Sequence, residues 1–367
     1  MIHEQYMQRA LDLAAKGRAL TSPNPMAGAV IVRNGRVIGE GWHSKAGSDH
    51  AEIAAIKNTK ERVKGSTLYV TLEPCHHWGR TPPCVDAVIE HDFKDVIIAV
   101  KDPNPLTAGK SIRKMKQAGI KVTTGIGEAE ARKLNEVFFK YITQKMPFVT
   151  AKIAQTLDGK IATASGSSQW ITSEKTRRLA KSLRKNFDAI LVGINTVLKD
   201  NPVLSAPGKI GFKKIVVDSQ LRTSISAKIF ENGKAAKDVI LAVTSRASAN
   251  KIKQFQIKGV TVIVCPLKDG RVDLKSLFKI LAEGEITSIL MEGGSHVIGS
   301  ALKDKLVDRL RIYMAPKIIG DREAKSSVVG VNVKDVNKSL RLKFGKMEKI
   351  GEDLFIEADV NYVHRNR

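Results

Sequence analysis

The sequence is poor in the features that mark secreted, membrane-spanning and disulfide-rich proteins. It holds only three cysteines in 367 residues, an odd number that argues against a disulfide framework and for a reducing compartment. No apolar run is long enough to cross a bilayer, and charges at Glu4, Arg9 and Asp12 interrupt the N-terminus, which is therefore not the apolar core of a signal peptide. We expect a cytoplasmic protein with no membrane partner, beginning with an amphipathic helix.

Aromatic residues are also scarce, at 5%, and basic residues outnumber acidic ones by 24. The excess is uneven: 22 Lys and Arg face 15 Asp and Glu over residues 1–145, against 39 and 22 in the remainder. A basic half can indicate nucleic-acid binding. Here the basic residues are scattered and lack the interleaved aromatics that stack on bases. We interpret them as a solvated surface and expect no nucleic-acid partner.

The length suffices for two domains, each with its own core. In the first half, a hairpin from Ala29 through the turn Asn34-Gly35 precedes strands at 67–72 and 95–100, with helices between them. After Pro147 the pattern begins again. Strands are expected there at 148–153, 189–193, 214–218, 239–244, 260–265 and 288–291. We predict a three-layer α/β domain over residues 1–145 and a mostly parallel α/β domain over residues 146–367.

Metal-ligand residues gather in the first half. His50-Ala51-Glu52 begins a helical pattern, and Cys75 follows a strand, with Cys84 nine positions later. Imidazole and thiolate groups suit Zn²⁺, and three protein ligands leave the fourth position for water. A carboxylate two residues from the His ligand can move a proton from that water to a leaving amine. We predict that His50, Cys75 and Cys84 bind Zn²⁺ in a deaminase whose proton shuttle is Glu52.

The gap between the two cysteines is unusual, because eight residues stand where the short deaminase motif has two. These residues must form a loop, and His76 and His77 within it are alternative ligands. The third cysteine, Cys265, ends an apolar run. We interpret Cys265 as a buried hydrophobic residue.

With Pro23-Asn24-Pro25, Gly41-Trp42-His43, and segments 71–75 and 79–84, the first half resembles the deaminase domain of the bifunctional riboflavin biosynthesis deaminase/reductases. The long loop ending at Cys84 is the specific element, since cytidine, guanine and tRNA adenosine deaminases use the short spacing. The resemblance implies a cytidine-deaminase-like fold and a diaminopyrimidinone substrate with a phosphoribosylamino group. Asn24 would contact the pyrimidine and Arg80 the phosphate.

The second half contains a glycine turn, Glu292-Gly293-Gly294-Ser295, between a strand and a helix. Such a turn lets the backbone and the helix N-terminus approach a phosphate, so by itself it predicts a nucleotide-binding α/β domain. Together with segments 152–160, 168–172, 193–196 and 200–202, it resembles the reductase domain of the same family, which is similar to dihydrofolate reductase. The resemblance implies NADPH as hydride donor and reduction of a ribosyl group to ribityl.

The resemblance also implies roles for individual residues of the second half. The implied catalytic residues are Lys152, Asp200 and Glu292. The implied cofactor-binding residues are Ala154, Trp170, Thr196, Asp200, Ser219, Gly293, Gly294, Ser295 and Gly299. The implied substrate-binding residues are Ser168, Arg184, Leu204 and Glu292.

Two further features concern the phosphate of the substrate. Arg177, Lys181 and Arg184 follow one another at helical spacing, which predicts one basic stripe. Pro207 stands where the family commonly has Arg, so that contact is either missing or supplied by Lys209 or Lys213.

We therefore predict a homo-oligomeric, bifunctional enzyme of riboflavin synthesis that uses Zn²⁺ and NADPH and acts on small phosphorylated pyrimidines. One alternative is a nucleic-acid base deaminase with a basic C-terminal binding domain. Another is a deaminase whose second domain is a scaffold without activity. The long loop between the cysteines and the shortage of aromatics favour the first interpretation.

Overall fold

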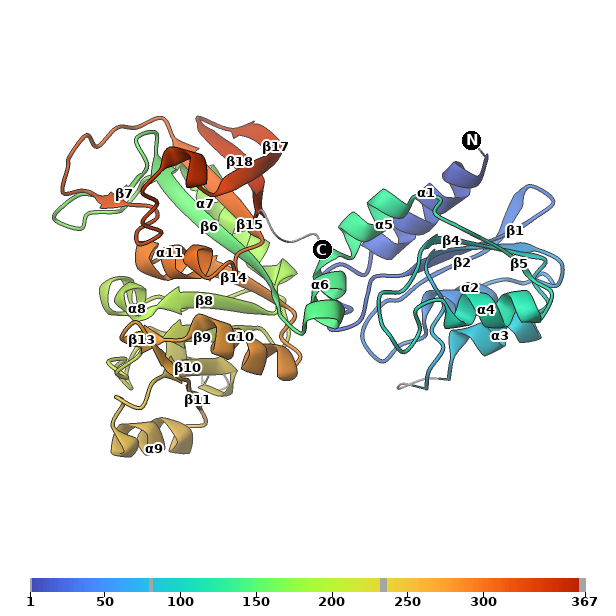
Figure 1. Ribbon diagram of the computed structural model, residues 1–367, viewed down its shortest axis with the longest axis horizontal. Coiled ribbons are helices and arrows are strands. Elements are labelled where there is room, and N and C mark those ends of the chain that lie inside the picture. Colours follow the sequence, from blue (N-terminus) through green and yellow to red (C-terminus); the bar gives the residue numbers. More distant parts are fainter. Residues whose placement is uncertain (1, 79–81, 232–235, 363–367) are drawn as a thin grey trace. The chain divides into compact units, whose positions relative to one another are not determined.

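The computed structural model describes residues 2–78, 82–231 and 236–362, and the chain divides into two compact units between Met146 and Pro147. Each unit has its own sheet and hydrophobic core and is described by itself (Figure 1). In the described ranges, no helix combines the length and the apolar character needed to cross a membrane.

The first unit contains a five-stranded sheet in the order β2-β1-β3-β4-β5. Its strands are β1 (Gly28–Arg33), β2 (Arg36–Trp42), β3 (Thr67–Leu72), β4 (Asp95–Val100) and β5 (Lys121–Thr124). β1 runs antiparallel to β2 and β3, whereas β3, β4 and β5 are parallel. Asn34 and Gly35 both have positive φ in the turn between β1 and β2, as a two-residue hairpin requires. The predicted hairpin and the strands at 67–72 and 95–100 are confirmed.

Helices cover both faces of this sheet, which makes the first unit the predicted three-layer α/β/α fold. The helices are α1 (Ile2–Ala15), α2 (Ala51–Lys57), α3 (Cys84–Glu90), α4 (Lys110–Gln117), α5 (Glu128–Leu134) and α6 (Glu136–Gln144). Successive residues of a strand point to opposite faces, so Ile31 packs with α2, α3 and α4, and Val30 packs with α1, α5 and α6. Burial on both faces explains why the central strands are almost wholly apolar.

The second unit contains a nine-stranded sheet in the order β11-β10-β9-β8-β14-β6-β15-β18-β17. Its strands are β6 (Phe148–Thr156), β8 (Ala189–Gly193), β9 (Lys213–Val217), β10 (Val239–Val243), β11 (Thr261–Val264), β14 (Ser288–Glu292), β15 (Arg309–Ala315), β17 (Arg341–Ile350) and β18 (Asp353–Asn361). All neighbours are parallel except the β15–β18 and β18–β17 pairs. The prediction of a mostly parallel sheet is confirmed.

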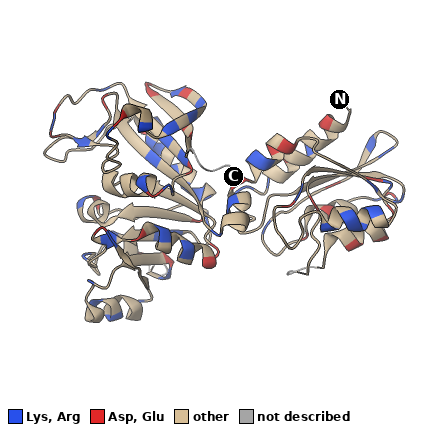
Figure 2. Cartoon of the chain, in the orientation of Figure 1, with Lys and Arg blue, Asp and Glu red and all other residues tan. Residues whose placement is uncertain are grey.

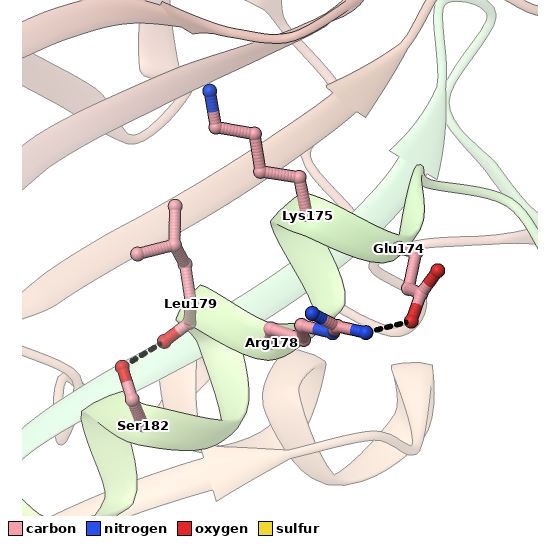
Figure 3. Close-up of a pocket in the computed structure, with 5 residues that line it drawn as sticks. All are labelled: Glu174, Lys175, Arg178, Leu179 and Ser182. Carbon is pink, nitrogen blue, oxygen red and sulfur yellow. Dashed lines mark hydrogen bonds and ion pairs between the residues drawn. The ribbon is translucent and has the colours of Figure 1, made fainter.

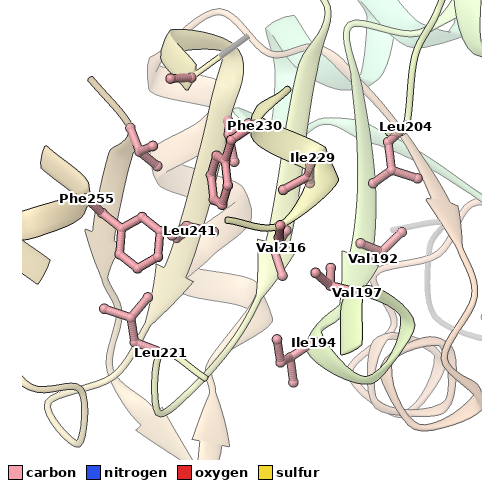
Figure 4. Packing of buried hydrophobic residues seen from close by; sticks show 14 of the residues in the cluster. Val192, Ile194, Val197, Leu204, Val216, Leu221, Ile229, Phe230, Leu241 and Phe255 are labelled. Atoms are coloured by element: carbon pink, nitrogen blue, oxygen red, sulfur yellow. The ribbon is translucent and has the colours of Figure 1, made fainter. Parts of the chain in front are cut away.

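Helices and short hairpins join these strands. The helices are α7 (Glu174–Ser182), α8 (Ile194–Asp200), α9 (Ala249–Ile257), α10 (Leu274–Glu283) and α11 (Ser295–Lys303), with 3₁₀ turns η1 (Leu183–Asn186), η2 (Lys228–Phe230), η3 (Ala236–Asp238) and η4 (Val336–Lys338). The small strands β7 (Lys160–Ala162) and β16 (Lys325–Ser326) pair with each other, as do β12 (Leu267–Lys268) and β13 (Arg271–Val272). One core cluster packs Phe230 and Phe255 against Val216 and Leu241 of the sheet (Figure 4).

Charged residues lie on helices and strands of both units, with acidic residues among the basic ones (Figure 2). Arg309 and Arg311 on β15, for example, pair with Asp359 and Glu357 on the neighbouring strand β18. Cys265 is buried, as predicted, with 4% of its surface exposed.

Candidate functional site

The three predicted metal ligands meet at one point of the first unit. His50 precedes α2, Cys75 lies in the segment after β3, and Cys84 is the first residue of α3. The Nδ1 atom of His50 is 3.5 Å from Sγ of Cys75 and 3.2 Å from Sγ of Cys84. Tetrahedral coordination with zinc bonds of about 2.0–2.3 Å places such N and S atoms roughly 3.5 Å apart. The donor set therefore fits Zn²⁺ in both chemistry and spacing.

The electrostatics of this cluster also suit a cation. The backbone N–H of Cys84, at the start of α3, donates to Sγ of Cys75 at 3.1 Å. Hydrogen bonding from Cys84, assisted by His50, lowers the pKa of Cys75 to about 4 despite the opposing effect of burial. The Cys75 thiolate and burial in turn raise the pKa of Cys84. Two thiols beside a buried carboxyl group, Glu52, concentrate negative charge that a divalent cation would neutralise.

Glu52 lies in the first turn of α2 with 3% of its surface exposed. Burial raises the pKa of Glu52 to about 7, although His50 acts in the opposite direction. A carboxyl group with a pKa near neutrality can both accept and return a proton at physiological pH. The helix thus carries a metal ligand and a proton carrier two residues apart, as predicted from the spacing.

Asn24, the predicted pyrimidine contact, is held by a histidine that sequence reasoning did not assign a role. Its Nδ2 atom is 3.1 Å from Nε2 of His43, and Nδ1 of His43 is 3.1 Å from the carbonyl oxygen of Asp49. The two contacts fit a neutral His43 that donates from Nδ1 and accepts at Nε2. Burial lowers the pKa of His43, which favours that form. The His43 ring also meets the His50 ring edge-on at 5.2 Å.

The loop between the cysteines is described only in part, and Arg80 lies outside the described residues. His77 contacts the hydroxyl of Thr107 through Nδ1 at 3.3 Å. Within the described ranges, His76 Nδ1 is buried without a hydrogen-bond partner. The ligand cluster found there consists of His50, Cys75 and Cys84. Neither His76 nor His77 belongs to this cluster in the described ranges, so the structure gives no support to the alternative that one of them replaces a cysteine.

Sequence reasoning also gave no role to Glu73, a buried carboxylate two residues before Cys75. It accepts hydrogen bonds from the backbone N–H groups of Asp102 at 3.2 Å, Gly109 at 2.9 Å and Ile112 at 3.3 Å. These bonds attach the segment after β4 to the segment that carries Cys75. The signal was available, since Glu73 is part of the segment 71–75 that carries the family resemblance.

In the second unit, a buried carboxylate stands between two basic side chains. Glu292 ends β14, and Lys152 is its register partner on the neighbouring strand β6. Arg184 donates to both carboxylate oxygens of Glu292 at 2.9 Å, and Lys152 Nζ lies 3.9 Å from Oε2. Burial acts to raise the pKa of Glu292, but Lys152 and Arg184 together outweigh it and lower that pKa. Glu292 is therefore ionised and holds both basic groups in place.

A cavity of about 670 Å³ opens beside Lys152, over the carboxyl-terminal edge of the parallel strands. The predicted site residues that line it are Lys152, Ala154, Ser168, Thr196, Asp200, Ser219, Gly293, Gly294 and Ser295. Gly293 has φ +76, and a Cβ atom there would lie 3.0 Å from the Thr196 hydroxyl. A side chain at this turn would fill the space between α8 and α11, so the glycines leave a cradle suited to a nucleotide phosphate.

Five predicted residues lie away from the lining of this cavity. Arg184 and Glu292 form the ion pair behind Lys152. Trp170 is 61% exposed, with the Arg177 guanidinium 4.2 Å from its ring centroid. Leu204 is buried in the hydrophobic core (Figure 4), and a Cβ on Gly299 would lie 1.8 Å from the carbonyl oxygen of Val329.

The predicted basic stripe on one helix face does not form. Arg177 donates to the Thr172 carbonyl oxygen at 2.6 Å, and Lys181 is exposed to solvent. Arg184 lies beyond the end of α7, in the turn η1, and points inward to Glu292. The change from α-helix to 3₁₀ turn breaks the spacing on which the prediction relied.

Neither lysine proposed in place of the missing arginine lines the cavity. Lys209 Nζ is 3.8 Å from a carboxylate oxygen of Asp188, and Lys213 pairs with Asp238 at 2.8 Å. Lys213 begins β9, whereas the cavity lies at the opposite, carboxyl-terminal ends of the parallel strands. The expectation that Lys209 or Lys213 supplies the phosphate contact is therefore wrong.

Other polar residues that line the cavity were given no role, because they come from separate elements and, apart from Asn195, lie outside the segments that carry the family resemblance. These residues include Asn195, Lys199, Arg222, Arg271 and Lys325. Arg222 donates to the Asn195 side chain at 3.1 Å, which joins the segment after β9 to the start of α8.

A second hollow, of about 530 Å³, follows the outer side of α7 (Figure 3). Its lining residues in the described part of the chain all come from that helix: Glu174, Lys175, Arg178, Leu179 and Ser182. The Glu174–Arg178 ion pair spans one turn of its wall. It contains none of the predicted site residues.

Two family models match the chain, one for each unit. Residues 1–100 match the cytidine and deoxycytidylate deaminase zinc-binding region, and residues 147–356 match the RibD C-terminal domain. Among curated proteins, the riboflavin biosynthesis protein RibD of Actinobacillus pleuropneumoniae is 44% identical over 96% of this chain and 94% of its own. The RibD protein of Aquifex aeolicus is 45% identical over 97% of this chain and 98% of its own.

Solved structures agree with these matches. Acinetobacter baumannii RibD superposes with a TM-score of 0.88 at 34% identity, covering 98% of this chain and 99% of that one. A diaminohydroxyphosphoribosylaminopyrimidine deaminase/5-amino-6-(5-phosphoribosylamino)uracil reductase from Thermotoga maritima superposes with a TM-score of 0.83 at 35% identity and the same coverage. Both the order of the two units and their folds are therefore those of known two-domain proteins.

Proposed function

The chain belongs to the RibD family of riboflavin biosynthesis enzymes, which unite a deaminase and a reductase, and on this premise we propose its two substrates. The first unit deaminates the diaminopyrimidine that carries a phosphoribosylamino group. The second unit reduces the ribosyl group of the product, 5-amino-6-(5-phosphoribosylamino)uracil, to ribityl. The Thermotoga relative is named for these two compounds.

The deaminase proposal rests on one observation, the cluster of His50, Cys75 and Cys84 beside the buried Glu52. Zn²⁺ held there would act as a Lewis acid and activate water for attack on the ring carbon. Glu52 accepts the proton that water loses and returns it to the leaving amine, which departs as ammonia. Asn24, positioned by His43, orients the pyrimidine through its amide.

The reductase proposal rests on the cavity bounded by the glycine turn and Lys152. NADPH bound there would supply the hydride that reduces the sugar carbon C1′. Glu292 holds Lys152 beside the cavity, so the ammonium can donate a proton or a hydrogen bond at the sugar. Asp200 also lines the cavity and can handle a proton. Arg184 fixes the orientation of Glu292.

We assign the remaining predicted residues to ligand binding in the same cavity. Ala154, Thr196, Ser219 and the turn from Gly293 to Ser295 would contact NADPH, and Ser168 would contact substrate. We keep Trp170, Gly299, Arg184, Leu204 and Arg80 as proposed binding residues on the family resemblance alone. A cytoplasmic homo-oligomer is also part of the proposal, in keeping with three cysteines that are all free.

The zinc-loaded full chain tests both activities. We expect ammonia release from the phosphoribosylamino diaminopyrimidine, followed by oxidation of NADPH when the cofactor is added. With 5-amino-6-(5-phosphoribosylamino)uracil as the only substrate, NADPH oxidation should proceed without ammonia release. Deamination of cytosine in single-stranded DNA, without activity on the pyrimidine, would instead favour a nucleic-acid deaminase. Absence of NADPH oxidation with the uracil compound would leave the second unit as a scaffold.

A further inference from the structure

Two lysine side chains from distant parts of the chain converge on one glycine of the reductase cavity. Lys199 lies in the last turn of the helix α8, and Lys325 lies on the small strand β16. Their Nζ atoms would lie 3.4 Å and 3.6 Å from a Cβ atom on Gly166. Gly166 has φ +94 and closes a turn by donating to the carbonyl oxygen of Thr163. All three residues line the cavity.

The two ammonium groups repel each other. Close contact with the Lys199 side chain, together with the positive charge of Lys199, lowers the pKa of Lys325. Across the described ranges, no ion pair joins Lys199 or Lys325 to a carboxylate. A bound anion would offset the repulsion between these two like charges. The lysine pair beside the glycine turn is therefore suited to bind an anion.

A phosphate group suits the site between the two lysines in its negative charge and in its hydrogen-bond acceptors. Its oxygens can accept hydrogen bonds from both ammonium groups at once. The hydroxyl of Ser168, two residues from Gly166, lines the same cavity and adds a possible donor. Because Gly166 has no side chain, its backbone leaves room between the two lysines.

Both the cofactor and the substrate carry phosphate groups that could bind in this cavity. Different parts of the cavity suit the phosphates of each ligand. The glycine turn faces Thr196, in the first turn of α8, and is suited to the cofactor. Arg222 and Arg271 lie with Ser219 and can take the remaining cofactor phosphate. Lys199 lies at the other end of α8, beside Asp200.

This chain lacks the arginine that the family pattern implies for binding the substrate phosphate. Pro207 stands at the position of the expected arginine, and Lys209 and Lys213 pair with Asp188 and Asp238. Arg184 is engaged on both sides of its guanidinium, by Glu292 and by the carbonyl oxygen of Ser205. A second basic site in the cavity would therefore supply the phosphate contact that Pro207 cannot make.

We propose that Lys199 and Lys325 together bind the phosphate of the ribosyl phosphate in the reductase substrate. This inference rests on the proposed function of the second unit. It makes the two lysines specificity determinants that replace the arginine lost at Pro207.

The test uses the zinc-loaded full chain and the variants Lys199→Gln, Lys325→Gln and their combination. The matched control carries Lys253→Gln and Lys279→Gln, which remove the same charge from exposed positions on α9 and α10. NADPH oxidation is measured with 5-amino-6-(5-phosphoribosylamino)uracil and with its dephosphorylated form. The double variant should raise KM for the phosphorylated substrate at least about tenfold. Its KM for the dephosphorylated form, its KM for NADPH and kcat should not change.

Inorganic phosphate is the second probe. It should compete with the phosphorylated substrate in the wild type and in the control, and should lose this effect in the double variant. A rise in KM for NADPH instead would assign the lysines to a cofactor phosphate and overturn the proposal. Unchanged KM values for all ligands would overturn it as well.

The proposed function can fail separately from this inference. If the wild type oxidises no NADPH, the reductase assignment fails. Binding of inorganic phosphate, followed by ³¹P NMR on the wild type and the double variant, still tests the lysine pair. Equal binding by both proteins would overturn it.

Discussion

The residues of the metal centre in the first unit lie close together in the sequence. The residues that line the cavity of the second unit lie far apart in the sequence. The metal ligands lie between His50 and Cys84, on elements that follow one another along the chain. The cavity is lined by residues from Lys152 to Val329. A site built from neighbouring elements can be recognised from spacing, whereas a site built across a sheet depends on how distant strands pair.

The two sites also differ in the sign of the charge they collect. The metal centre gathers two thiols and a buried carboxyl group, which is the environment that a cation requires. The cavity gathers Lys199, Lys325, Arg222 and Arg271, which is the environment that phosphorylated ligands require. Among the described residues, these four basic side chains of the second unit line one cavity. Each unit should respond to its own substitutions and not to those in the other.

Glu52→Gln should have the largest effect, with loss of the activity of the first unit and no change in that of the second. The amide cannot carry a proton, so we expect ammonia release to fall by about 10²–10⁴-fold. Zinc content, measured by atomic emission, should stay at the wild-type level, and NADPH oxidation with the uracil substrate should be unchanged. Glu90→Gln, on the exposed side of α3, is the matched control. Retained ammonia release would refute the role of Glu52.

Glu292→Gln should have the reciprocal effect on the reductase. Lys152 and Arg184 lose their common buried carboxylate, and breaking a buried ion pair from one side is costly. We expect NADPH oxidation to fall on the order of 10²-fold, since Lys152 is no longer held at the cavity. Ammonia release should not change, and Glu283→Gln on α10 should be silent in both assays. A fall in both activities would contradict independent units.

Two glycines test how each site depends on close packing of the backbone. A Cβ on Gly41 would lie 2.3 Å from the backbone nitrogen of Ala55 in α2, and one on Gly299 would lie 1.8 Å from the carbonyl oxygen of Val329. Neither neighbour can rotate away, so alanine should cost about 1–3 kcal/mol locally. We expect Gly41→Ala to weaken zinc retention about tenfold and Gly299→Ala to weaken NADPH binding by a similar factor.

Competition with a zinc chelator and fluorescence titration of NADPH measure these two effects. Each variant should leave the other ligand unaffected. Ser44→Ala, at an exposed position three residues after Gly41, is the control for the first unit. Ser300→Ala, next to Gly299, is the control for the second. Crossed effects would show that the packing of one unit governs the other.

Asp102→Asn should produce the smallest effect, and one that depends on pH. Burial raises the pKa of Asp102 to about 6, from 3.8 for a free carboxyl group. A raised carboxyl pKa means that ionisation opposes folding: the cost appears above about pH 4 and is complete above about pH 6. The amide removes this cost but weakens the bond from the Asn104 N–H. At pH 8 we expect a local gain of about 1 kcal/mol.

Hydrogen exchange of β4 amides in the full chain measures this gain. Protection should exceed that of the wild type at pH 8, and this difference should disappear as the pH falls to 5. Protection that is greater at pH 5 than at pH 8 would contradict the assigned direction. No comparable pH response is expected in β8 of the second unit.

Much of the first unit could be predicted because its strands are short apolar runs with clear ends. The bounds of β3 and β4 agree with the sequence pattern, since both strands are buried on both faces. Two neighbouring strands of the second unit, the edge strand β17 and the strand β18 beside it, were not predicted. β17 is exposed along most of its length, and β18 alternates only weakly, so neither shows the apolar pattern of a core strand.

The positions of side chains were harder to predict than the strands. Arg184 was expected on a helix face, but the chain enters a 3₁₀ turn and directs the guanidinium to Glu292, 108 residues away. Leu204 was expected at the substrate and is part of the core. For Arg184 the deciding contact involves a partner far away in the sequence.

By itself, the sequence determined the metal ligands, the proton carrier, the alternation of strands and helices, and the family. These properties depend on residue type and short spacing, because a helix start or a strand end places nearby residues predictably. Only the tertiary structure decided that Glu292 holds Lys152 and Arg184, that Lys209 and Lys213 are engaged elsewhere, and that Lys199 meets Lys325 at Gly166. Such contacts arise from the pairing of distant strands, which no local pattern of residues encodes.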